Sequence, residues 1–234
     1  PLGHTGPVNQ RPGPSLIELD LPGSPTTWSD LGFVVVDDRI TLDNLVLVVG
    51  SPEPRLALDP VPDGVGDWLG LPVRPISGQR HGGQTSADEA GATSATSATT
   101  ATPNRITGVD HIVIMTPEER STVESIAMLG WEIRRERLST IAGVDAVQRF
   151  VWAGAVLLEI VTPVARNQES DEEPVAAQVW GVSFASSDLD ETVSFLGPRS
   201  GPPRAAVQPG RRIATLQRGV VDHRLHVAIM TARA

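Results

Sequence analysis

The feature of this sequence that most constrains its fold is a pattern of apolar runs that recurs along the chain. The clearest copy opens with the apolar run at residues 111–115, turns at Thr116-Pro117 and continues as a helical stretch that ends at residues 129–131. It closes with a second apolar run at residues 156–161. Repetition at this scale usually reflects duplication of one supersecondary unit. We therefore expect a chain built from repeated modules of strands and one helix.

A second copy of the pattern occupies residues 179–231, with an opening strand at 179–184, a helix after Ser187 and a closing strand at 225–231. Inside the first copy, alternating apolar residues predict further strands at 132–137, 146–152 and 155–161. A shortened copy is expected at residues 16–52, followed by a strand at 55–59 and a short helix within 63–71.

The composition divides the chain into three segments. Residues 86–102 consist almost entirely of Ala, Thr, Ser and Gly, with two acidic residues, and such a stretch has no large apolar side chains with which to form a core. We therefore expect a degenerate N-terminal part at residues 1–77, a flexible linker at 78–104 and a domain of two modules at 105–234.

Charge and composition exclude several classes of function. A net charge of −9 argues against nucleic acid as a partner, because phosphates require a positive surface. The chain has no Cys, which excludes disulfides, thiol nucleophiles and Cys-based metal sites. No apolar run approaches the ~20 residues needed to cross a bilayer, and no signal-peptide pattern is visible. We expect a cytoplasmic protein with no membrane partner.

Two ionisable residues, His111 and Glu159, interrupt strands that are otherwise aliphatic. A polar group in such a strand must find a partner or a function. Each gains a partner by meeting the other, so we expect their side chains to face each other across neighbouring strands. The pair is either part of a functional site or a buried polar pair whose hydrogen bonds are satisfied.

This order of strands, with its His and Glu, resembles the vicinal oxygen chelate superfamily, which includes glyoxalase I, bleomycin-resistance proteins, fosfomycin-resistance enzymes and extradiol dioxygenases. The resemblance covers residues 106–232 and, more weakly, 15–75. Residues 207–216 are similar to glyoxalase-like proteins of an actinobacterial type. The resemblance implies an α+β fold in which repeated βαβββ modules form curled mixed β-sheets around a cleft.

The resemblance also implies a divalent metal (Zn, Fe, Mn or Ni) held by His111 and Glu159, with Glu159 as a ligand or as a catalytic base. Family sites draw ligands from two paired modules, and the second module of this chain has Gly181 and Ala228 at the corresponding positions. A catalytic Zn²⁺ or Fe²⁺ typically has three protein ligands. His226 is the candidate for the third, because it lies two residues before Ala228 and points to the same side of the strand.

The same alignment places Leu16 and Val48 at these positions in the N-terminal copy, so no ligands are expected there. Arg149, on a middle strand of the first module, is the candidate for binding an anionic substrate. A surface charge on a strand is the alternative interpretation of this residue.

Three functions remain open. The first is a glyoxalase-like protein that binds a small oxygen-rich molecule with the help of the metal, as a lyase or dioxygenase if it is an enzyme. The second is a metal-free binding or sequestering protein of the bleomycin-resistance type, which would use Trp and apolar walls. The third is a duplicate that has lost its site. The expected partner is a small molecule, and formation of a homodimer is left open.

Overall fold

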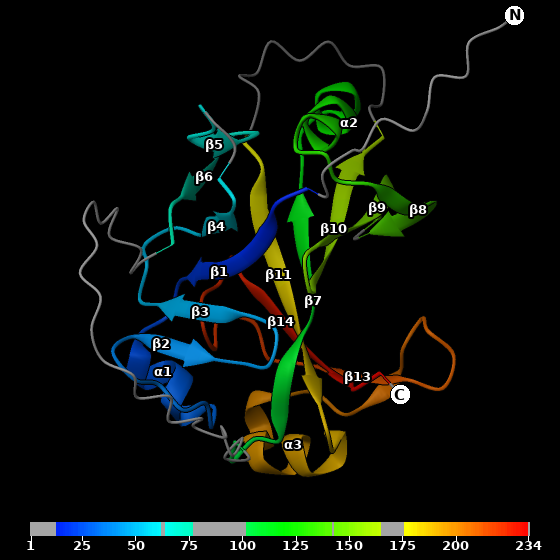
Figure 1. Ribbon diagram of the computed structural model, residues 1–234. Coiled ribbons are helices and arrows are strands. Elements are labelled where there is room, and N and C mark those ends of the chain that lie inside the picture. Colours follow the sequence, from blue (N-terminus) through cyan, green and yellow to red (C-terminus); the bar gives the residue numbers. More distant parts are fainter. Residues whose placement is uncertain (1–12, 62–63, 77–101, 142, 165–175, 234) are drawn as a thin grey trace, which may run out of the picture.

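The computed structural model describes residues 13–61, 64–76, 102–141, 143–164 and 176–233. These residues form two mixed β-sheets, called here the N-terminal sheet and the C-terminal sheet, with short helices at their ends (Figure 1). The α+β architecture of curled mixed sheets expected from the sequence is confirmed.

The C-terminal sheet is built from two successive groups of elements with the same order. The first group comprises β7 (Ile106–Met115), α2 (Glu119–Met128), β8 (Ile133–Ile141), β9 (Val144–Ala153) and β10 (Val156–Pro163). The second comprises β11 (Gln178–Ser186), α3 (Leu189–Leu196), the 3-10 helix η1 (Gly197–Arg199), β12 (Arg204–Ala205), β13 (Arg212–Thr215) and β14 (His226–Thr231). The strand order is β12-β13-β14-β11-β7-β10-β9-β8, so the opening strands β7 and β11 meet at the centre as antiparallel neighbours.

The N-terminal sheet has the strand order β2-β3-β1-β4-β6-β5. Its elements are β1 (Ser15–Leu21), α1 (Pro25–Asp30), β2 (Arg39–Thr41), β3 (Val46–Val49), β4 (Arg55–Asp59), β5 (Asp67–Trp68) and β6 (Leu71–Arg74). The short helix expected within residues 63–71 is wrong for the described part of that range. Asp67–Trp68 pairs instead as a strand with β6, through a turn at Leu69 and Gly70 that both adopt positive φ.

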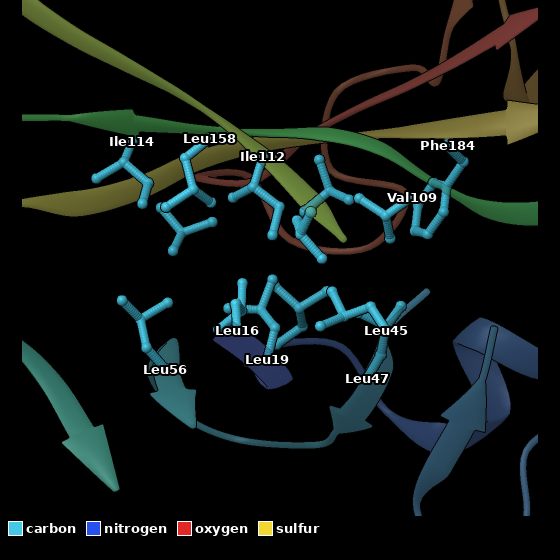
Figure 2. Packing of buried hydrophobic residues seen from close by; sticks show 14 of the residues in the cluster. Leu16, Leu19, Leu45, Leu47, Leu56, Val109, Ile112, Ile114, Leu158 and Phe184 are labelled. Carbon is cyan, nitrogen blue, oxygen red and sulfur yellow. The ribbon is translucent and has the colours of Figure 1, made fainter. Parts of the chain in front are cut away.

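The two sheets share one hydrophobic core. Leu16, Leu19 and Leu47 of the N-terminal sheet point toward Ile112 and Leu158 of the C-terminal sheet, and all five side chains are buried (Figure 2). Neighbouring residues along a strand point to opposite faces. The residues next to Ile112 and Leu158 therefore project from the other face of the C-terminal sheet, away from this core.

The predicted linker at residues 78–104 lies mostly outside the described residues, which resume at Thr102. None of the helices in the described ranges is long and apolar enough to cross a membrane.

Candidate ligand-binding cavity

A cavity of about 650 Å³ lies on the face of the C-terminal sheet that points away from the N-terminal sheet. This volume lies within the usual range of small-molecule sites. Both modules contribute to its walls. The residues that line it and that carry polar side chains are His111, Arg137, Gln148, Glu159, Trp180, Ser183, Arg204, Gln208, Thr215 and His226.

His111 and Glu159 meet in this cavity, as the sequence predicts. They lie on β7 and β10, which are parallel neighbours, and His111 Nε2 is 3.7 Å from Glu159 Oε2. Both side chains are largely buried, with exposed fractions of 13% and 12%. The separation is too long for a direct hydrogen bond. One ligand atom placed between the two groups would contact both.

A β-bulge places Asp110 directly behind His111. Across the β7–β11 pairing, His111 is opposite Ser183 and Val109 is opposite Phe184, which leaves Asp110 as the extra residue on β7. Its Oδ1 is 2.8 Å from His111 Nδ1. The bulge thus brings two consecutive side chains together that would otherwise point to opposite faces of the strand.

Asp110 is held as a carboxylate. Burial raises its pKa, but hydrogen bonds from His111 and Arg211, together with their charges, outweigh burial and hold the pKa well below its usual range. Arg233 adds a further ion pair, with Nε 3.4 Å from Asp110 Oδ2. An ionised carboxylate can only accept a hydrogen bond, so Nδ1 of His111 donates to it and Nε2 is the ring nitrogen that faces Glu159.

Gln148 and Arg137 complete the polar part of the cavity, and neither was among the residues expected from the sequence. Gln148 Nε2 donates to Glu159 Oε1, and Arg137 Nε donates to Gln148 Oε1. Gln148 is buried, with an exposed fraction of 4%. The amide therefore holds the Glu159 carboxylate in one orientation and is itself held by Arg137. Gln148 could have been recognised as a candidate from the sequence, because it is a polar residue among the apolar residues of β9.

Trp180 and His226 form the wall at the second module. A second bulge, between the Val179 and Gly181 pairings, leaves Trp180 as the extra residue on β11. Its ring stacks on that of His226 with a centroid distance of 4.0 Å and an interplanar angle of 22°. Burial, and then the charge of Arg218, lower the pKa of His226, which favours the neutral ring in this stack.

Arg149 does not lie in the cavity, so its expected approach to an anionic ligand there is not found. It follows Gln148 on the same strand and therefore points to the opposite face. There it is 1% exposed, and its guanidinium forms ion pairs with Glu119 at 2.6 Å and with Glu136 at 2.8 Å. It links α2 to β8.

The residues present do not complete the metal site that the resemblance implies. His111 Nε2 and Glu159 Oε2 are close enough for both to reach one metal at about 2.1 Å each. Among the described residues, however, no group of three His, Cys, Asp or Glu side chains could hold a metal ion. His226 lines the cavity and stacks on Trp180, but it does not join the other two as the expected third ligand.

The strand registers agree with the module alignment in the C-terminal sheet. Leu158 pairs with Ile112 in the first module, and Val227 pairs with Val182 in the second. Gly181 precedes Val182 as His111 precedes Ile112, so Gly181 occupies the position of His111. Ala228 follows Val227 as Glu159 follows Leu158, so Ala228 occupies the position of Glu159. Two small residues therefore stand where further ligands would be needed, and they leave space.

The register corrects the alignment in the N-terminal sheet. If Val48 corresponds to Glu159, the pairing of Leu19 with Leu47 assigns the His111 position to Glu18. Leu16 instead faces the core between the sheets (Figure 2). The misalignment arises because Pro22 follows the paired Leu19 by three residues, whereas Pro117 follows the paired Ile112 by five. Aligning the two strand ends therefore shifts the position by two residues.

An ion-pair cluster occupies this part of the N-terminal sheet. Glu18 pairs with Arg39 and, at 2.8 Å, with Arg74, which also pairs with Asp20. Burial raises the pKa of Glu18, but the hydrogen bonds and charges of Arg39 and Arg74 outweigh it and lower that pKa. In the N-terminal sheet, the position that Gly181 leaves open in the C-terminal sheet is thus occupied by Glu18 and its arginine partners.

Comparison with known proteins identifies the fold. No protein-family model matches the sequence, and no curated protein shows a similar sequence. A mutant of 4-hydroxymandelate synthase from Streptomyces coelicolor matches 95% of this chain and 94% of its own, with a TM-score of 0.58 and 14% identity. The chain has the vicinal oxygen chelate fold. At this level of identity the match shows the fold and no shared activity.

Other proteins with the vicinal oxygen chelate fold match over different shares of their length. A fusion protein of a xylose isomerase-like TIM barrel and 4-hydroxyphenylpyruvate dioxygenase matches all of this chain and 51% of its own, with a TM-score of 0.58 and 11% identity. Methylmalonyl-CoA epimerase from Mycobacterium tuberculosis matches 56% of this chain and 91% of its own, with a TM-score of 0.42 and 16% identity.

Proposed function

We propose that the chain binds a small oxygen-bearing organic molecule in the cavity of the C-terminal sheet, and that binding requires no resident divalent metal. The observation that carries this proposal is the set of donors. His111 and Glu159 converge at 3.7 Å, while the corresponding positions of the second module hold Gly181 and Ala228. The site thus offers two polar groups and open space instead of a closed ligand set.

Each polar group at this end of the cavity is held before a ligand arrives. Asp110 fixes the ring of His111 through Nδ1, and Gln148 fixes the carboxylate of Glu159 through Oε1. Groups that are already ordered lose little conformational entropy when a ligand binds. A ligand hydroxyl or amide placed between His111 Nε2 and Glu159 Oε2 would meet two fixed partners.

Binding of a neutral hydrophobic probe tests this proposal. N-phenyl-1-naphthylamine fluoresces in apolar cavities, carries one N–H donor and should bind wild-type protein treated with a chelator. Ala228→Phe places a phenyl group in the cavity and should abolish binding. Ala127→Phe, the same substitution on the exposed side of α2, is the matched control and should bind normally. Equal binding by both variants would place the probe outside the cavity.

A divalent metal held by His111 and Glu159 is the second candidate, as part of a lyase or dioxygenase of the kind that the resemblance implies. One observation favours it. A His that binds a metal usually donates its other ring N–H to a carboxylate, a backbone carbonyl or water, and His111 makes such a contact with the carboxylate of Asp110. The metal would supply Lewis-acid activation of ligand oxygens.

Thermal unfolding with added Zn²⁺, Mn²⁺, Ni²⁺ and Fe²⁺ tests the metal candidate. A ligand that binds only the folded state raises the melting temperature by mass action. If the metal candidate holds, the shift should vanish in His111→Ala and Glu159→Ala and persist in His223→Ala, whose side chain is 78% exposed. The shift should persist in His226→Ala unless this ring serves as a third ligand. No shift in wild type would remove the metal candidate.

A further inference from the structure

The charge of the cavity differs in sign from that of the whole chain. Among the described residues that line it, Arg137 and Arg204 are cationic and Glu159 is anionic, while the chain as a whole carries −9. Behind His111, the single carboxylate of Asp110 is paired with two arginines, Arg211 and Arg233, so this cluster also has more positive than negative charge. A cavity of this sign attracts anions.

Arg137 has the hydrogen-bonding capacity to bind such an anion. Its Nε donates to Gln148 Oε1, and its guanidinium lies 5.5 Å from the centre of the Phe150 ring. Its two terminal nitrogens make no hydrogen bond to any of the described residues. A guanidinium whose terminal N–H groups are available matches the geometry of a carboxylate, sulfonate or phosphate.

Glu159 can accept a hydrogen bond from a ligand donor that lies near that anionic group. Its Oε1 is already occupied by Gln148, while Oε2 faces His111 without a direct hydrogen bond. Because Gln148 contacts both Arg137 and Glu159, one buried amide fixes the spacing between a cationic and an anionic group. A ligand that satisfies both must carry an anionic group and a hydrogen-bond donor at a similar spacing.

Part of the cavity wall, next to these polar groups, is apolar. Val113, Met115, Ile141 and Trp180 line it and form a small hydrophobic cluster on this face of the sheet. A wholly polar ligand would leave these side chains in contact with water. A ligand with an apolar ring or chain would bury them.

We infer that the ligand is an organic anion with an apolar body and a hydrogen-bond donor close to its charged group. Arg137 binds the anionic group, Glu159 accepts from the donor, and Gln148 is the positioning residue that sets their spacing. This inference rests on the proposed function and specifies its ligand class.

Two fluorescent probes that differ mainly in charge test the inference. 1-Anilinonaphthalene-8-sulfonate has an apolar body, an N–H donor and an adjacent sulfonate, and N-phenyl-1-naphthylamine is its neutral analogue. Wild-type protein should bind the anionic probe about tenfold or more tightly than the neutral one, because a hydrogen bond between charged groups is stronger than a neutral contact.

Variants of Arg137 identify the group responsible. Arg137→Gln should weaken binding of the anionic probe about tenfold and leave binding of the neutral probe unchanged. Arg137→Lys keeps the charge and should therefore retain part of the difference between the two affinities. Gln148→Leu should reduce the ratio of the two affinities, which a general loss of structure would not do. Arg134→Gln is the matched control on the same strand, since Arg134 is 59% exposed and pairs with Glu132. It should change neither affinity.

The outcomes separate this inference from the proposed function. If neither probe binds wild type, the proposed function fails. If the neutral probe binds and the anionic probe binds no better, or if Arg137→Gln and Arg134→Gln have equal effects, only the ligand class is wrong. Where the anionic probe binds better, competition by 1-naphthoate and by 1-naphthyl phosphate shows which anionic group the cavity prefers.

Discussion

Replacement of Asp110 by Asn should destabilise the protein far more than the same change at an exposed ion pair. The Asp110 side chain is 1% exposed and contacts His111 at 2.8 Å, together with Arg211 and Arg233. Asn keeps the shape and can still accept hydrogen bonds, but it removes the charge that the two arginines neutralise. Arg211 is only 12% exposed, so water cannot fully replace the lost partner.

The magnitude follows from these contacts. Breaking a fully buried ion pair costs about 3–5 kcal/mol, and a hydrogen bond to a charged group contributes about 1.5–3 kcal/mol. Arg233 is 43% exposed and Asn retains some hydrogen bonding, so the lower part of this range applies, about 2–3 kcal/mol. Equilibrium unfolding in urea, followed by Trp fluorescence, measures the change.

Asp190→Asn is the matched control, because Asp190 pairs with the neighbouring Arg212 and both side chains are exposed. It should leave the free energy of unfolding unchanged. Equal effects of Asp110→Asn and Asp190→Asn would refute the argument that burial makes the first ion pair important. A double variant with Arg211→Met should recover part of the loss, since it removes the uncompensated charge.

Further predictions concern the cavity wall and the N-terminal sheet. Gly181→Ala should cost about 1–3 kcal/mol, because the new Cβ would lie 2.9 Å from the carbonyl oxygen of His226, whereas Gly66→Ala has open space and should be neutral by the same unfolding assay. Glu18 has a lowered pKa, so its ionised form stabilises the fold above its ordinary pKa of 4.5, and this contribution is lost as the pH falls below that value. Melting temperatures between pH 6 and pH 3 should therefore fall more steeply for wild type than for Glu18→Gln, and parallel curves would contradict the assignment. Arg149→Met should perturb packing between α2 and β8 without changing probe affinity, because this residue lies outside the cavity.

The sequence predicts the parts of the fold that depend on regular periodicity. His111 and Glu159 could be placed together because each is the ionisable residue of an apolar strand, and parallel neighbouring strands align them. The two positions at which the second module lacks ligands were also correctly aligned, since the β11–β14 pairing, like the β7–β10 pairing, carries no register shift.

The parts that escaped prediction depend on bulges and on contacts between strands. Asp110 and Trp180 are the extra residues of two bulges, and simple alternation would point each of them away from the cavity. In the N-terminal copy, the shorter distance from the paired residue to the strand-ending Pro shifted the alignment from Glu18 to Leu16. Arg149 was expected to bind an anion, but it points to the opposite face from its neighbour Gln148, which lines the cavity. Pairing register, which decides between these faces, is a tertiary property.

Binding of N-phenyl-1-naphthylamine with and without metal tests the central claim most directly. Protein treated with a chelator and protein supplied with Zn²⁺, Mn²⁺, Ni²⁺ or Fe²⁺ should bind the probe with the same affinity, and Ala228→Phe should bind it in neither condition. Probe binding that appears only after a metal is added, and that His111→Ala abolishes, would contradict a metal-free cavity and establish the metal-dependent site instead.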